Sequence, residues 1–150
     1  MWPVSNDRAR PWRVVHVEHP RIGVPMSLTS GLWRLRGHPD LVVLDMPAPS
    51  ARRYLDLLGE RVHSGGALRA GALVDGLHEA FRFGLVAVEE DLRVELARWD
   101  AARRRDPRRP LLQLVWPDLC GTLPWEAGYA PAAAGLRQPL LGRWPRRGAR

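Results

Sequence analysis

Residues 111–129, LLQLVWPDLCGTLPWEAGY, decide how the rest of the chain is interpreted. The first five form an apolar run between two prolines, a length and a setting typical of a buried strand. Because Pro117 cannot donate to a sheet ladder, we expect regular pairing to end near Trp116. Gly121 then predicts a tight loop, after which Trp125 brings a second large ring back towards the domain.

Two acidic residues accompany these tryptophans: Asp118 comes two positions after Trp116, and Glu126 directly follows Trp125. In one interpretation the rings close the end of the core and the carboxylates accept hydrogen bonds in the loop, so that the segment is a structural clasp. In the other, the two rings are the walls of a ligand pocket with acidic rims. We favour the clasp, because buried aromatic side chains more often serve packing than ligand recognition.

The chain has 150 residues, enough for one domain with a sizeable core. Its single cysteine, Cys120, excludes an internal disulfide framework and a cysteine-based zinc site, and it predicts a reducing, cytoplasmic setting. The first ten residues lack the apolar centre of a signal peptide, and no apolar run approaches membrane-spanning length. We therefore expect no membrane partner.

The charge is concentrated at the C-terminus. All 23 basic residues are arginine against 16 acidic residues, and five of the arginines follow Glu126, the last acid, which leaves 18 arginines in residues 1–136. A basic tail can contact nucleic-acid phosphates, but such tails are more often only solvated. We predict a loose segment over residues 1–11, a domain over 12–142 and a disordered basic tail over 143–150, and we consider nucleic acid an unlikely partner.

Alternating and β-branched segments predict the strands of one sheet. In chain order they are residues 12–18 (WRVVHVE), 25–33 (PMSLTSGLW), 41–46 (LVVLDM), a short strand around Leu73-Val74, 81–88 (FRFGLVAV) and 111–115 (LLQLV). An apolar stripe predicts a helix that opens at residues 48–50 and is stopped by residues 64–66, Ser-Gly-Gly. A second helix is predicted to start at the acidic residues 89–91, whose charge suits a helix N-terminus. The fold class is therefore a single α+β domain with a mostly antiparallel sheet of five or six strands and two main helices.

A second pair of candidate residues, His38 and Asp40, lies in the corner GHPD before the strand at 41–46. These side chains could act as an acid–base pair, or Asp40 could cap the amides of a turn. The turn is favoured, because aspartate is common in turns. His16 and His19 point to opposite faces of the first strand with no third ligand nearby, so we predict no metal site.

No catalytic or cofactor signature is present in the sequence. There is no Gly-x-Ser-x-Gly elbow, and His78-Glu79 lacks the second histidine that a zinc-protease helix requires. The glycines have neither phosphate-loop nor dinucleotide spacing. We expect no cofactor, and we lean against an enzyme.

Several segments together resemble a known family: PWRVVHV, GHPDLVVLDMP, ALVDGL, FRFGLVAVEE, LLQLVWPDLCGTLPWEAGY and QPLLG. Over roughly residues 12–142 the chain resembles the uncharacterised bacterial family "domain of unknown function 4262". The resemblance implies a single α+β domain in a bacterial cytoplasm, and it implies no activity. The chain departs from the family at residues 25–32, where relatives look richer in aromatic residues.

The leading hypothesis is a small cytoplasmic binding or interaction module, of accessory or immunity type, that recognises another protein. The rival is a small-molecule-binding protein or small enzyme with a pocket walled by Trp116 and Trp125. A weaker alternative is nucleic-acid association through the arginine-rich C-terminus. The candidate binding residues are His38, Asp40, Trp116, Asp118, Trp125 and Glu126.

Overall fold

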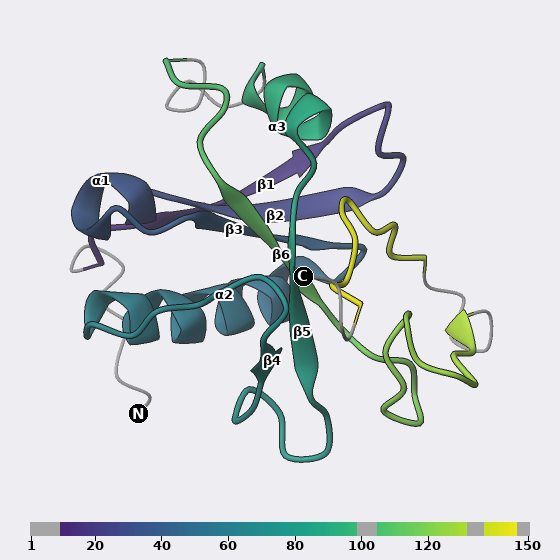
Figure 1. The fold of residues 1–150 in the computed structure, drawn as a ribbon. Helices are drawn as coiled ribbons and strands as arrows, with labels where there is room; N and C mark the ends of the chain where they lie inside the picture. The colour runs from purple at the N-terminus through teal and green to yellow at the C-terminus, as the bar shows by residue number, and fades with distance from the viewer. Residues whose placement is uncertain (1–9, 99–104, 132–136, 147–150) are drawn as a thin grey trace.

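Short apolar and β-branched segments pair into one mixed sheet, with strand order β1-β2-β3-β6-β5-β4 (Figure 1). The computed structural model describes residues 10–98, 105–131 and 137–146. Its strands are β1 (Arg13–Glu18), β2 (Pro25–Ser30), β3 (Asp40–Leu44), β4 (Leu73–Val74), β5 (Phe83–Ala87) and β6 (Leu111–Val115). Its helices are α1 (Leu32–Arg36), α2 (Ala48–His63) and α3 (Glu90–Ala97). The predicted α+β class, the number of strands and the two main helices are confirmed.

Four of the five strand pairings are antiparallel, and the pairing of β3 with β6 is parallel. In that parallel pair Asp40 lies opposite Leu111 and Val42 opposite Gln113. The carboxyl ends of β3 and β6 therefore reach the same edge of the sheet side by side.

The two central strands are buried on both faces. On one face the apolar stripe of α2 packs against Leu41 and Val43 of β3 and Leu114 of β6. On the other face, Val42 and Leu44 pack with Leu96 of α3. Figure 1 shows α2 and α3 on different sides of the sheet. Burial on both faces explains why LVVL and LLQLV read as nearly continuous apolar runs and not as alternating patterns.

The strand predicted over residues 25–33 is too long. Pairing ends at Ser30, and Leu32 begins the short helix α1, which the sequence pattern did not predict. Gly31 separates the two elements with φ 120°, a backbone conformation that side chains other than glycine rarely adopt. Gly37, with φ 61°, then closes α1 in the left-handed conformation typical of a helix C-terminus.

The C-terminal segment, residues 137–146, is bound to the sheet face opposite α2. Gln113 of β6 is fully buried; its Nε2 donates to the Pro139 carbonyl at 2.7 Å and its Oε1 accepts from the Leu141 N–H at 2.8 Å. Further along, Trp144 stacks on Trp125 with ring centroids 4.1 Å apart. The described structure thus continues past residue 142. The division into loose start, domain and tail stays a prediction, and residues 1–9 and 147–150 lie outside the described residues.

Candidate functional site

The parallel pairing brings two turns together at one edge of the sheet. Residues 45–47 follow β3, and residues 116–118 follow β6. In sheets with parallel strands, ligands commonly bind outside the carboxyl ends of those strands. This edge is therefore where a site is expected on topological grounds.

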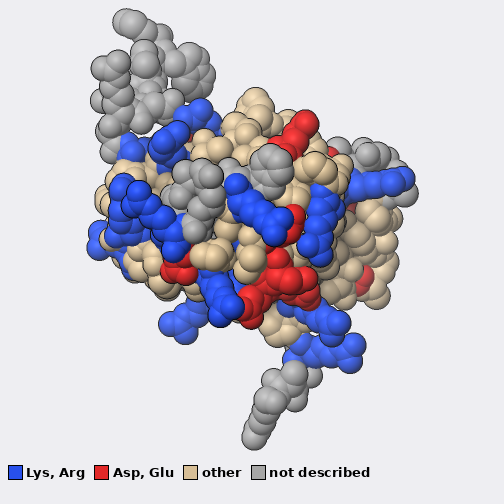
Figure 2. All heavy atoms as spheres, turned by 90° about the horizontal axis from the view of Figure 1, so that it is seen from above, with Lys and Arg blue, Asp and Glu red and all other residues tan. Residues whose placement is uncertain are grey.

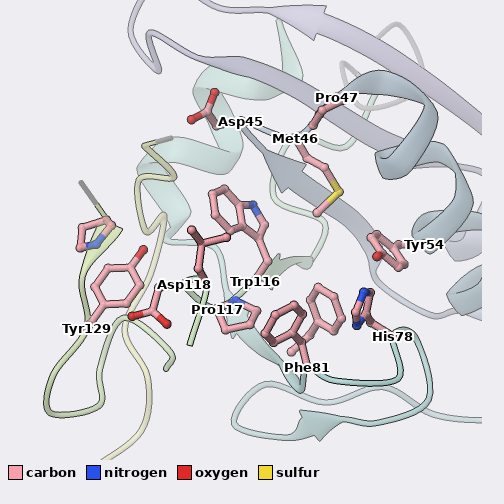
Figure 3. Close-up of a pocket in the computed structure, with 13 residues that line it drawn as sticks. Asp45, Met46, Pro47, Tyr54, His78, Phe81, Trp116, Pro117, Asp118 and Tyr129 are labelled. Carbon is pink, nitrogen blue, oxygen red and sulfur yellow. The ribbon is translucent and has the colours of Figure 1, made fainter. Parts of the chain in front are cut away.

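A pocket of about 220 Å³ opens at this edge (Figure 3). Its lining is mainly aromatic rings and prolines, with two aspartates: Asp45, Met46, Pro47, Tyr54, His78, Phe81, Phe83, Trp116, Pro117, Asp118, Leu119, Tyr129 and Pro131. The chain contains two tyrosines and two phenylalanines, and all four line this pocket. The Tyr and Phe side chains of the protein are thus concentrated at one place.

Trp116 is held in the pocket wall by three hydrogen bonds. Its indole Nε1–H donates to the Leu44 carbonyl at 2.8 Å, which ties the end of β6 to the end of β3. Its backbone N–H donates to Oε1 of Gln138 at 3.1 Å, and its carbonyl accepts from Nε2 of the same side chain. Because the indole N–H is already used, the ring has only its apolar surface left to offer a ligand.

Asp45 turns the chain from β3 towards α2. Among the described residues it is the only one other than glycine with a positive φ, 53°. Aspartate tolerates this left-handed conformation better than most residues, yet the conformation is uncommon and often marks a functional site. Its backbone N–H donates to the Pro25 carbonyl at 2.9 Å, and its Oδ2 accepts the backbone N–H of Arg137.

Asp118 closes the loop that carries Tyr129 to the pocket. Its Oδ1 accepts the N–H groups of Cys120 and Thr122, both at 2.9 Å, and its Oδ2 accepts the Ala130 N–H at 2.9 Å. The N–H groups of Thr122 and Ala130 lower the pKa of this carboxyl most; burial opposes them, and the Cys120 and Gly121 amides lower the pKa further. Asp118 therefore does what the clasp interpretation expected of it: its carboxylate accepts hydrogen bonds from the backbone of the loop.

The lowered pKa of Asp118 makes loop stability depend on pH. An aspartate in an unfolded chain has a pKa of about 3.9. Because the folded pKa lies below that value, the ionised carboxylate contributes in full above it, contributes less as the pH falls, and contributes nothing below the folded pKa. We expect denaturant unfolding between pH 6 and 2 to show this decline in the native protein and a shallower decline in Asp118→Asn. Asp75→Asn, a change at an exposed acid outside the pocket, is the control. Equal slopes for Asp118→Asn and the native protein would contradict the assignment.

Trp125 and Glu126 lie away from this pocket. Trp125 packs with Val86 and Val115 on the sheet face opposite α2, whereas Trp116 packs on the α2 face. Glu126 accepts the Leu123 N–H at 2.9 Å, and its Oε2 lies 3.9 Å from Arg82. The structure thus separates the two tryptophans by the sheet, and only Trp116 and Asp118 of the four residues line the pocket.

His38 and Asp40 lie at the opposite end of β3. Asp40 is buried and accepts from the Thr29 hydroxyl at 3.0 Å and from the Leu32 N–H at 3.1 Å, so it caps the backbone that enters α1. His38 accepts the Leu68 N–H on Nε2 at 2.9 Å, and Nδ1 lies 2.8 Å from the Pro39 carbonyl. These partners assign the neutral tautomer with the proton on Nδ1. Neither side chain faces the pocket at the other end of the strand.

Most residues that line the pocket were not predicted from the sequence. Tyr54 comes from α2 and lies 5.2 Å from Phe83, ring centroid to centroid, while Phe81 stacks on His78 at 4.8 Å. One local signal was available, because Phe81 and Phe83 are two positions apart and so share a face of an extended segment. Tyr129 gave no local signal, since its place depends on the loop that Asp118 closes.

Within the described residues, no three histidine, cysteine, aspartate or glutamate side chains lie close enough together to hold a metal ion. In the same part of the chain, no helix has the length and apolar character needed to cross a membrane.

The fold and the pocket define a small single-domain α+β protein with an aromatic site at the carboxyl ends of two parallel strands. The chain matches the model of the family described as "Domain of unknown function (DUF4262)" over residues 8–130, and it belongs to that family. Comparison with curated proteins and with solved structures found no match. The matched residues end before the C-terminal segment, although Gln138 of that segment holds Trp116 in place.

Proposed function

We propose that this protein is a small binding module, and that it recognises one compact, mainly apolar group in the aromatic pocket between the ends of β3 and β6. The observation that carries the proposal is the concentration of both tyrosines, both phenylalanines and Trp116 around a single pocket. Ligand pockets are typically apolar and aromatic with a few polar groups, and they favour the carboxyl ends of parallel strands.

The size of the pocket limits its ligand. Most pockets for drug-sized ligands measure about 300–1,000 Å³, whereas a dry cavity of about 150 Å³ holds one benzene ring. A volume of about 220 Å³ therefore suits one ring or a group of similar size. A nucleotide is too large to be enclosed.

The polar groups of the pocket support binding more than catalysis. Both oxygens of Asp118 accept backbone N–H groups, and its pKa is lowered. A general acid or base working near neutral pH needs a pKa shifted in the opposite direction. Asp118 is thus suited to hold the loop and to carry a fixed negative charge.

A second candidate function is recognition of a partner protein, as an accessory or immunity-type module, through the same pocket. Leu119 lines the pocket and is 68% exposed, which is unusual for a large apolar side chain. Protein interfaces often anchor one aromatic or aliphatic side chain in such a pocket. Under this second proposal, the apolar group that enters the pocket is a side chain of a partner protein.

Nucleic-acid association remains the weaker proposal. Figure 2 shows basic and acidic side chains interspersed on the face seen from above, without a stripe of one sign. Around α3, Arg21 lies 3.8 Å from Glu95, and Arg108 lies 3.4 Å from Glu90. Such pairing reduces the electrostatic attraction of these arginines for phosphates.

A cytoplasmic location likewise stays a prediction.

The proposed function is tested by titrating the protein with indole and phenol, two small ring compounds, and following binding by ligand-observed NMR. We expect both to bind, and we expect Tyr129→Ala and Phe81→Ala to weaken binding by about tenfold through loss of ring contacts. Trp33→Ala removes a half-buried ring from α1 outside the pocket and should leave binding unchanged. No binding, or equal weakening by all three variants, would refute the proposal.

A further inference from the structure

The charge of the aromatic pocket differs from that of the whole chain. The protein has 23 arginines among 150 residues and a formal net charge of +7. Among the described residues, the pocket lining nevertheless contains two aspartates, Asp45 and Asp118, and no arginine. We propose that the ligand of this pocket is an organic cation, an amine or a quaternary ammonium group carried on a body about the size of one ring. This inference rests on the proposed function and names the class of ligand.

Among the residues that the structure describes, no basic side chain forms an ion pair with either aspartate. In the part of the chain that the structure describes, the hydrogen-bond partners of both carboxylates are neutral backbone N–H groups. By contrast, the buried Asp56 does have a basic partner, since its Oδ2 lies 2.6 Å from Nη1 of Arg10. Backbone amides satisfy the hydrogen bonding of a carboxylate but leave its net charge in place. Within the described part of the chain, the pocket therefore keeps two negative charges that no arginine pairs with.

One local feature acts in the opposite direction. Pro47 lines the pocket and immediately precedes α2, whose N-terminus carries a partial positive charge of about half a unit. Two full carboxylate charges exceed this partial charge. The net field in the pocket therefore favours a cation and disfavours a carboxylate or phosphate ligand.

The rings add a second attraction for a cation. A cation within about 6 Å of the face of a tryptophan, tyrosine or phenylalanine ring is attracted by the ring's negative face, and aromatic cages bind quaternary ammonium groups in this way. Figure 3 shows Tyr54 and Tyr129 on opposite sides of Trp116 and Pro117. The indole N–H of Trp116 is bonded to Leu44, so this ring has no donor left for an anion.

Asp45 is the residue we assign to selecting the charge of the ligand. Its Oδ2 accepts the Arg137 N–H, while its Oδ1 accepts no hydrogen bond from any residue that the structure describes. Its side chain is half-buried, and its backbone has the positive φ described above. Asparagine also tolerates this conformation, so Asp45→Asn removes the charge and keeps the turn.

The inference is tested with three compounds that share one ring: benzylamine, a cation at pH 7; benzyl alcohol, its neutral analogue; and benzoate, an anion. Isothermal titration calorimetry of the full chain at fixed ionic strength measures the three dissociation constants. We expect benzylamine to bind about tenfold more tightly than benzyl alcohol, and benzoate to bind most weakly. Asp45→Asn should reduce the preference for benzylamine, although Asp118 and the rings still attract the cation, and it should leave the binding of benzyl alcohol unchanged. Asp75→Asn should leave the preference intact.

The outcomes separate the two proposals. If benzyl alcohol binds as tightly as benzylamine, or if Asp45→Asn keeps the preference in full, the cation assignment is overturned while the aromatic binding site stands. If none of the three compounds binds, and indole and phenol do not bind either, the proposed function fails together with the cation assignment.

Discussion

Replacing Gly142 with alanine is expected to lower the free energy of unfolding by about 3 kcal/mol, the upper end of the usual cost of overpacking. A Cβ atom at this position would lie 1.8 Å from the Ala87 carbonyl oxygen and 2.9 Å from Cγ1 of Val86. Because the closest atom belongs to the backbone of β5, no side chain can rotate to make room. The C-terminal segment must move away, which strains the bond from the Glu89 N–H to the Leu141 carbonyl, 2.8 Å in length.

Thermal unfolding gives the first measurement of this effect, and for a chain of this size the loss corresponds to a drop in Tm of about 10 °C. Near-ultraviolet circular dichroism gives the second, because Trp125 and Trp144 stack with an interplanar angle of 4° and their coupled signal should weaken. Leu140→Ala, at a side chain 38% exposed in the same segment, is the control and should change Tm little. An unchanged Tm for Gly142→Ala would show that this segment does not lie against β5 in solution.

Gln113→Leu is expected to cost about 4 kcal/mol. The side chain is fully buried and bonds both the Pro139 carbonyl and the Leu141 N–H. Leucine keeps much of the volume but leaves these two backbone groups without partners, and each unsatisfied buried group costs about 1–3 kcal/mol. Denaturant unfolding measures the loss directly as a lower midpoint at an unchanged slope.

The double variant Gln113→Leu with Gly142→Ala gives the internal check. Both changes act by releasing the same C-terminal segment, so their combined cost should be clearly smaller than the sum of the single costs. Strict additivity would mean that the two positions act independently. In that case the C-terminal segment, residues 137–146, does not detach from the sheet as one cooperative unit.

Much of the fold was predictable because its signals are local. The helix over residues 48–63 shows its apolar stripe, and Leu73-Val74 lies between turn residues. The strand β6 was predicted with its observed bounds from the length of the run and its flanking prolines. The short helix α1 was missed, since five residues contain too few turns for a periodic signal and Gly31 alone marks the change of direction.

Less of the site was predictable. Of the predicted residues, Trp116 and Asp118 line the pocket, and both follow the end of β6 so closely that the sequence places them together. Their expected companion Trp125 lies across the sheet, because Val115 and Trp116 are adjacent in an extended segment and adjacent side chains point to opposite faces. The partner of Trp125, Trp144, could not be inferred from spacing, as the two are joined only through tertiary contacts.

The sequence by itself determined the fold class, most of the secondary structure and the family of this protein. Periodicity, turn residues and flanking prolines act over a few residues, so they can be read along the chain. The tertiary structure alone decided that β3 and β6 run parallel, that their ends meet, and that Tyr54, Phe81 and Tyr129 converge on Trp116. These outcomes depend on which distant strands pair and which faces pack, and that choice is made by the free energy of the whole core.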